Sequence, residues 1–104
     1  MSLAEAFDLP SLARYGERRD ARVVSDAPEA RLVLFSLQDG QQVRGRGEPR
    51  VSLVVVEGEG ELWAGEVRVA ARAGTLLACA PDEEHGARAG AGRFLVLGII
   101  TPRP

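Results

Sequence analysis

The chain has 104 residues, of which 45% are hydrophobic and 27% are charged, so it is long enough for one hydrophobic core and too short for two domains of ordinary size. Its formal net charge of -2 at pH 7 gives little long-range attraction to nucleic acid or to an anionic membrane, both of which favour strongly basic proteins. We therefore expect one globular domain that has neither nucleic acid nor a membrane as a partner.

The N-terminal residues and the cysteine content indicate a cytoplasmic protein. Cys79 is the single cysteine, so the chain has no internal disulfide, and we expect this thiol to be a small core residue. Glu5 and Asp8 interrupt the apolar residues that a signal peptide would need. No apolar run approaches the roughly 20 residues that span a bilayer.

Residues 1–20 are expected to form an N-terminal arm that packs across the outside of the domain. The arm carries scattered apolar residues among charges, and Pro10-Ser11 precedes Leu12. Because proline is tolerated in the first turn of a helix, this sequence predicts about one helical turn. The remaining residues, 21–104, are expected to form the domain itself.

From residue 21 onward the chain consists of short apolar segments separated by Gly, Pro, Asp and Ser, a pattern typical of strands and turns. Residues 57–60, Glu-Gly-Glu-Gly, are interpreted as a tight reversal that makes a hairpin of residues 51–64. A polar stretch, 41–50, is expected to hold a short strand and a loop. The other expected strands are 22–24, 31–37, 67–71, 75–80, 85–88 and 94–100, with turns expected at Gly65-Glu66 and at Gly90-Ala91-Gly92. About nine short strands predict an all-β sandwich or barrel.

Two of these strands, 51–56 and 94–100, are apolar at nearly every position. A strand of this kind is expected to be buried on both faces. One face belongs inside the barrel, and the other needs a cover. The simplest cover for a small domain is a second copy, so we predict a homodimer whose interface includes the arm or residues 94–100.

The order of features over residues 30–100 resembles that of a small single-domain cupin with a cupin 2-like conserved barrel. The resemblance rests on the apolar strand that ends in Glu57-Gly58-Glu59-Gly60, on Ala73-Gly74 before another apolar strand, and on His85 about eleven residues later. It implies a jelly-roll β-barrel of two antiparallel sheets, often dimeric. Many cupins hold a divalent metal at the barrel mouth with three His and one Glu.

The metal-binding motifs of that family are degenerate in this sequence. Counting back from Gly58 places Val51 at the family's Glu position and Arg44 and Arg46 at its His pair, whereas His85 is retained. A shifted alignment that pairs Arg46 with Glu48 also stays open. Since the chain has one His, a transition metal needs three or four ligands, and a guanidinium cannot ligate, we expect no metal and no other cofactor.

Arg44, Arg46 and His85 are the residues that we expect to bind a ligand. Two arginines beside a histidine at the barrel mouth suit a small anionic molecule, because Arg binds carboxylate or phosphate through two parallel hydrogen bonds. In a second interpretation the arginines are solvated or ion-paired on an exposed loop. His85 would then be a hydrogen-bonded residue at the rim and not a general acid or base.

Two other functions are compatible with the sequence. One is a metal-dependent cupin enzyme, an oxygenase or an isomerase, which requires bound metal or an acid–base pair. The other is a structural or accessory dimeric protein without a small-molecule site, in which Val51, Leu53 and Val55 fill the barrel mouth. The fold alone favours none of the three.

Overall fold

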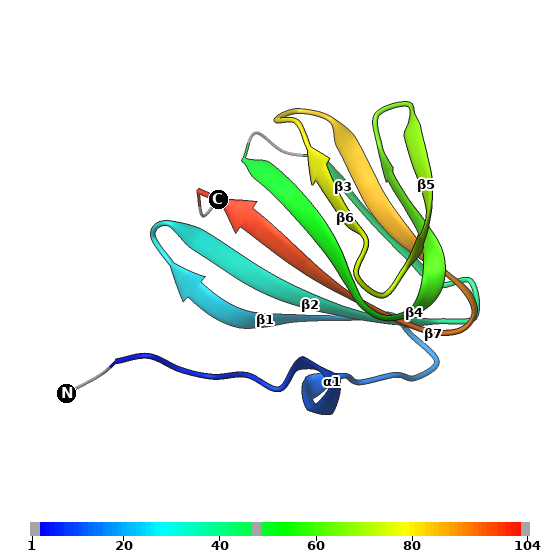
Figure 1. Cartoon of the computed structure of the whole chain (residues 1–104), viewed down its shortest axis with the longest axis horizontal. Helices are drawn as coiled ribbons and strands as arrows, with labels where there is room; N and C mark the ends of the chain where they lie inside the picture. The colour runs from blue at the N-terminus through cyan, green and yellow to red at the C-terminus, as the bar shows by residue number, and fades with distance from the viewer. Residues whose placement is uncertain (1–2, 47–48, 103–104) are drawn as a thin grey trace.

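The computed structural model describes residues 3–46 and 49–102, which form a β-barrel preceded by a short arm (Figure 1). The arm contains the one-turn helix α1 (Leu9–Leu12), with Pro10 in its first turn, as the sequence predicts. The strands of the described residues are β1 (Asp20–Ala27), β2 (Ala30–Gln38), β3 (Gln42–Arg46), β4 (Arg50–Ala64), β5 (Val67–Arg72), β6 (Leu76–Cys79) and β7 (Glu84–Thr101). The expectation of an all-β jelly roll of antiparallel strands is confirmed.

Two long strands, β4 and β7, run through both layers of the barrel. The first half of β4 pairs with the second half of β7, from Val51 opposite Ile100 to Gly58 opposite Phe94. Together with β1, β2 and β6 they form one layer. The second half of β4 pairs with the first half of β7, and β3 and β5 flank them in the other layer. In Figure 1 both strands bend at the lower right, and the layers open toward the top.

The predicted hairpin over residues 51–64 is wrong, because the chain continues through Glu57–Gly60 as one strand. Pairing with β7 shifts register between Val55 and Glu57 and again between Gly58 and Gly60, which are β-bulges that bend β4 from one layer into the other. Gly58 has φ +84°, and a Cβ on it would meet the backbone of Arg93. Glycine is therefore required here for a bend and a close strand contact, not for a reversal.

The predicted turn at Gly90-Ala91-Gly92 is wrong for the same reason, because these residues lie inside β7. The turn predicted at Gly65-Glu66 is confirmed. It connects β4 to β5 as a two-residue reversal, with Gly65 at φ +59°. The structure thus merges four predicted strands into two, and its described residues form seven strands where the sequence predicted about nine.

The core lies between the two layers and consists of inward-facing residues from both. Its buried members come mainly from β4 and β7: Leu37, Val51, Leu53, Val55, Leu62, Ala64, Ala71, Cys79, Ala87, Ala89, Phe94 and Val96. Alternate residues of a strand point to opposite faces, so this set fixes which side chains of each strand face the interior. Within the described ranges, no helix is long and apolar enough to cross a membrane.

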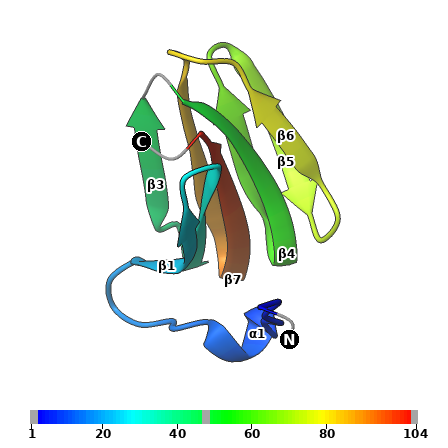
Figure 2. The ribbon, with the colours of Figure 1, turned by 90° about the vertical axis from the view of Figure 1, so that its left-hand side faces the viewer.

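The arm covers part of the outer face of the β1-β2-β7-β4 layer, as Figure 2 shows from the side. The backbone N–H of Arg14 donates to Ser36 Oγ at 3.0 Å, and Arg22 donates to the carbonyl oxygen of Leu12 at 3.4 Å. Leu34 and Leu95, which face outward beside Ser36, are completely buried. The chain therefore supplies part of the cover that the sequence analysis assigned to a second copy, and the homodimer stays a prediction.

Candidate functional site

The barrel mouth is formed by the strand ends that meet at the open side of the two layers. β3 ends opposite the start of β7, with Gly45 paired to His85, and β4 ends beside them, with Ala64 also paired to His85. On the other layer, Val51 at the start of β4 pairs with Cys79 and with Ile100. Directly paired residues of neighbouring strands point to the same face of the sheet. Since Ala64 belongs to the core, its partner His85 also faces the interior of the barrel.

The imidazole of His85 lies over Gly45. A Cβ placed on Gly45 would stand 3.1 Å from His85 Nε2, which is tighter than an ordinary van der Waals contact. The other ring nitrogen, Nδ1, donates to the backbone carbonyl oxygen of Glu83 at 3.3 Å. Since a carbonyl can only accept, this bond places a proton on Nδ1 and leaves Nε2 as an acceptor whenever the ring is neutral. His85 is half-buried.

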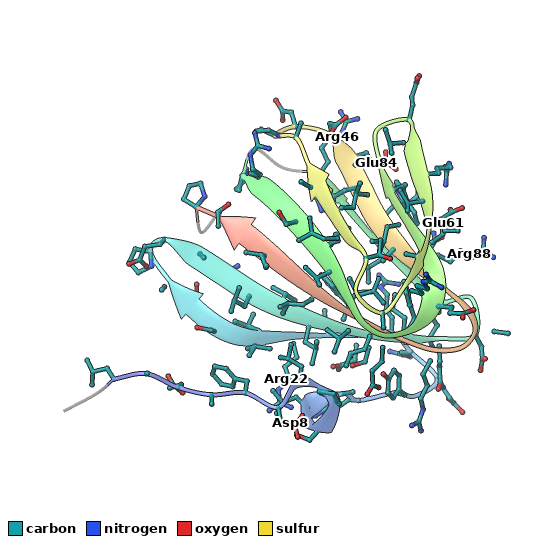
Figure 3. The ribbon with its side chains drawn as sticks, in the orientation of Figure 1. Asp8, Arg22, Arg46, Glu61, Glu84 and Arg88 are labelled. Atoms are coloured by element: carbon teal, nitrogen blue, oxygen red, sulfur yellow. The ribbon has the colours of Figure 1, made fainter. Side chains whose placement is uncertain are left out.

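Arg44 and Arg46 do not join His85 at the mouth. They pair with Gly86 and Glu84 on β7, so they share the face opposite to that of Gly45 and His85. Both side chains are exposed, and Figure 3 shows Arg46 and Glu84 together at the upper end of the outer face. The structure therefore separates the three residues that the sequence analysis grouped, although their binding of a ligand remains untested.

The inward positions of β3 are Val43 and Gly45, and the inward position at the start of β4 is Val51. None of these three residues can ligate a metal. Val51 is 7% exposed and packs within the core. The alternative alignment involved Glu48, which lies outside the described residues. The residues present thus do not fit the metal site that the cupin fold implies.

The carboxylates near the mouth point in different directions. Glu83 Oε1 accepts a hydrogen bond from the backbone N–H of Ala80 at 2.9 Å, which closes the turn before β7. Glu84 faces outward and lies 3.8 Å from Arg44. Asp82 has φ +68° in the same turn and is exposed. Among residues 3–46 and 49–102, no three His, Cys, Asp or Glu side chains form a group that could hold a metal ion.

Cys79 is a buried thiol in the barrel interior, opposite Val51. Burial raises its pKa above the ordinary thiol value, and the nearby charge of Glu83 raises the pKa further. A raised pKa keeps the sulfur protonated and therefore unreactive at neutral pH. This agrees with the expectation of a core residue.

The outer face of the second layer carries a line of contacts that the sequence analysis missed. Trp63 lies across Gly86, where a Cβ would collide with the indole ring. The guanidinium carbons of Arg44 and Arg68 stand 5.9 and 5.6 Å from the ring centroid, within cation–π range. Arg68 also donates to Glu61 Oε1 at 2.9 Å. The Trp63 side chain is consequently only 4% exposed, although it faces away from the core.

A shallow groove of about 1040 Å³ adjoins that line on the same outer face. Small residues of β4, β5 and β7 form its floor, including Gly60, Ala70 and Gly90. Two arginines, Arg72 on β5 and Arg88 on β7, line it on either side, and Glu59 and Glu61 of β4 lie between them. The glycines and alanines were the only sign of this groove in the sequence. They could not predict it, because the strand register is needed to show that they lie side by side on adjacent strands.

Comparison with known proteins supports the architecture described above. No protein-family model and no curated protein matches the chain. Among solved structures, TT1209 from Thermus thermophilus is 28% identical, with a TM-score of 0.90 over 97% of this chain and 100% of that chain. An RmlC-like cupin protein from Desulfovibrio desulfuricans is 27% identical, with a TM-score of 0.85 over 95% and 97% of the two chains.

A further similarity extends to KdgF from Halomonas sp., at 19% identity and a TM-score of 0.76 over 88% of this chain and 86% of that chain. Identity this low shows a shared fold and no more. The RmlC-like neighbour and the antiparallel double layer agree with the resemblance seen in the sequence. The chain therefore has the fold of a small cupin-type domain.

Proposed function

We propose that this chain is a metal-independent cupin that binds a small molecule at the barrel mouth, with His85 as the polar group that holds the ligand. The observation that carries the proposal is the replacement of inward-facing ligand positions by Val43, Gly45 and Val51. One imidazole without these partners is too small a ligand set for a transition metal. It is sufficient to orient an organic molecule in an otherwise apolar site.

The chemistry of His85 defines which groups a ligand can present. With Nδ1 donating to Glu83, a neutral imidazole accepts a hydrogen bond at Nε2, so it suits a hydroxyl group. A protonated imidazole donates from Nε2 and suits a carboxylate or phosphate. The anionic ligand expected from the sequence would bind the protonated form of the ring.

Arg44 and Arg46 keep a part in this proposal only as outward-facing residues. They stand on the same strand as Gly45 but on its other face, so an anion in the mouth would interact with them through the strand and not by direct hydrogen bonds. Replacing either residue should leave binding at the mouth within about twofold, since exposed charges contribute little over such separations. His85→Ala should lower the affinity at least tenfold.

The test is a thermal-shift screen of sugars, sugar phosphates and small carboxylates, with and without divalent metals, followed by calorimetry on the compounds that stabilise the protein. His85→Ala is compared with Arg46→Ala, which changes the neighbouring position on the opposite face. Metal content of protein purified without chelator is measured in parallel. Stabilisation by a metal alone, or equal losses in the two variants, would contradict the proposal.

A structural or accessory role is the second candidate function, and the packing of β4 favours it. Val51, Leu53 and Val55 are 7%, 2% and 2% exposed, so they fill the barrel directly beneath the mouth. A protein that acts only through its surfaces needs no ligand space there. This candidate predicts that no compound of the screen stabilises the protein and that light scattering after size exclusion finds a dimer.

A further inference from the structure

The outer face of the second layer contains arginines of two kinds. Arg44 and Arg68 are engaged, since both stack on Trp63 and each pairs with a glutamate. Arg72 and Arg88 line the groove, and within the part of the chain that the structure describes neither forms an ion pair. Two exposed guanidinium groups beside one groove therefore keep their hydrogen-bonding capacity for another molecule.

The strand register places charges of alternating sign across the groove. Arg88 on β7 is opposite Glu61 on β4, and Arg72 on β5 is opposite Glu59 on β4. Strands lie about 4.8 Å apart and rise about 3.4 Å per residue, so the Cα atoms of Arg72 and Arg88 are separated by roughly 12 Å. The two glutamates stand between them, one of them already neutralised by Arg68.

The size of the groove suits a small molecule. Its volume of about 1040 Å³ is close to the upper end of the range of small-ligand sites. Ala70 and Gly90, the small outward-facing residues of its lining, leave space above the sheet. Arg88 leans toward the β2–β3 turn, where its Nη2 would be 3.9 Å from a Cβ on Gly40, so its guanidinium lies over the groove edge and can bind one end of a ligand.

We propose that this groove is a second binding site, which takes a small dicarboxylate that carries hydroxyl groups between its two ends. Arg72 and Arg88 bind one carboxylate each through paired N–H donors, and the hydroxyl groups of the middle segment donate to Glu59 and Glu61. The ligand needs its hydroxyl groups as well as its two carboxylates because Glu59 and Glu61 lie between the two arginines. Without hydroxyl groups, these glutamates would face an apolar segment of the ligand. The site is independent of His85 and of the proposed function at the mouth.

The experiment uses three six-carbon probes that separate these contributions: glucarate, which has two carboxylates and hydroxyls; adipate, which has the carboxylates alone; and sorbitol, which has hydroxyls alone. Binding is followed through the arginine Nε–H signals in nitrogen-15 NMR spectra at constant ionic strength. We expect glucarate to shift the signals of Arg72 and Arg88 and to bind at least fivefold more tightly than adipate, with no binding of sorbitol.

Arg72→Gln and Arg88→Gln should each weaken glucarate binding about fivefold, and the double variant should abolish it. Arg31→Gln is the matched control, because Arg31 pairs with Asp26 on the other layer. His85→Ala should leave glucarate binding unchanged, which separates this site from the mouth. Equal binding of glucarate by the double variant and the wild type, or signal shifts spread over all arginines, would overturn the proposal.

Discussion

The two faces of β3, β4 and β7 in the second layer differ in almost every respect. The inner face carries small and apolar residues with a single histidine, whereas the outer face carries arginines, glutamates and Trp63. Both faces bury side chains, but the inner one does so by packing core residues together and the outer one by laying arginines over an indole ring. Successive residues of a strand point to opposite faces, so a shift of one residue decides whether a side chain joins the apolar inner face or the charged outer face.

Leu62 and Glu61 are neighbours on β4 that face opposite sides. Replacing each of them by alanine should give the largest difference in the free energy of unfolding between the two faces. Leu62 is completely buried, and Leu62→Ala should lower the free energy of unfolding by about 3 kcal/mol because it leaves a cavity. Glu61→Ala removes an exposed pair with Arg68 and should cost less than about 1 kcal/mol. Urea unfolding of both variants measures the difference, and losses of similar size would refute the assignment of the two faces.

Much of the fold was predictable from local sequence. The turn at Gly65-Glu66, the one-turn helix at Pro10 and the apolar strands 51–56 and 94–100 were all found from residue type and spacing. The bend at Gly58 was not, because a Gly-x-Gly segment suits both a reversal and a pair of bulges. Pairing with residues far along β7 decides between them, and no local pattern contains that information.

The candidate site was less predictable for a related reason. Arg44 and Arg46 were placed at the mouth by counting back from Gly58 across the polar stretch 41–50, and an offset of one residue moves every side chain to the other face. The register with β7 shows that Val43 and Gly45 face inward. Trp63 is covered by arginines of two other strands, which the sequence alone could not bring together.

The packing of Trp63 against Gly86 gives the second test of the outer face. A Cβ on Gly86 would meet both the indole ring and the backbone of Val43, so Gly86→Ala should lower the free energy of unfolding by about 1–3 kcal/mol through overpacking. Gly90 is an outward glycine of the same strand, where a Cβ would be 3.4 Å from the carbonyl oxygen of Glu59. Gly90→Ala should change stability by less than about 0.5 kcal/mol, and equal effects in urea unfolding would argue against a packed Trp63.

The contact between Arg68 and Trp63 should have a smaller effect. A cation–π contact at an exposed site is worth about 0.5–1 kcal/mol, and Arg68→Ala removes it together with the Glu61 pair. A double-mutant cycle with Trp63→Leu isolates the contact, and the coupling energy should lie in that range. Arg72→Ala serves as the control on the same strand and should show no coupling to Trp63→Leu.

The pH dependence of stability due to Cys79 is the smallest of these effects. It is also the most direct measure of whether water reaches the inner face. The pKa of Cys79 is raised by burial and by the charge of Glu83. The ordinary pKa of a thiol is about 8.5. Between that pH and the higher pKa of the folded protein, the unfolded chain releases a proton that the folded chain keeps. The stability is therefore fully present below about pH 8.5 and falls as the pH rises through the folded pKa. Urea unfolding at about pH 7.5 and about pH 9.5, on either side of the ordinary thiol pKa, should show this decline in the wild type and a weaker one in Cys79→Ala. A thiol that reacts with an alkylating reagent in the native protein as fast as in the unfolded chain would mean that water reaches the barrel interior, and the contrast between the two faces would then disappear at this residue.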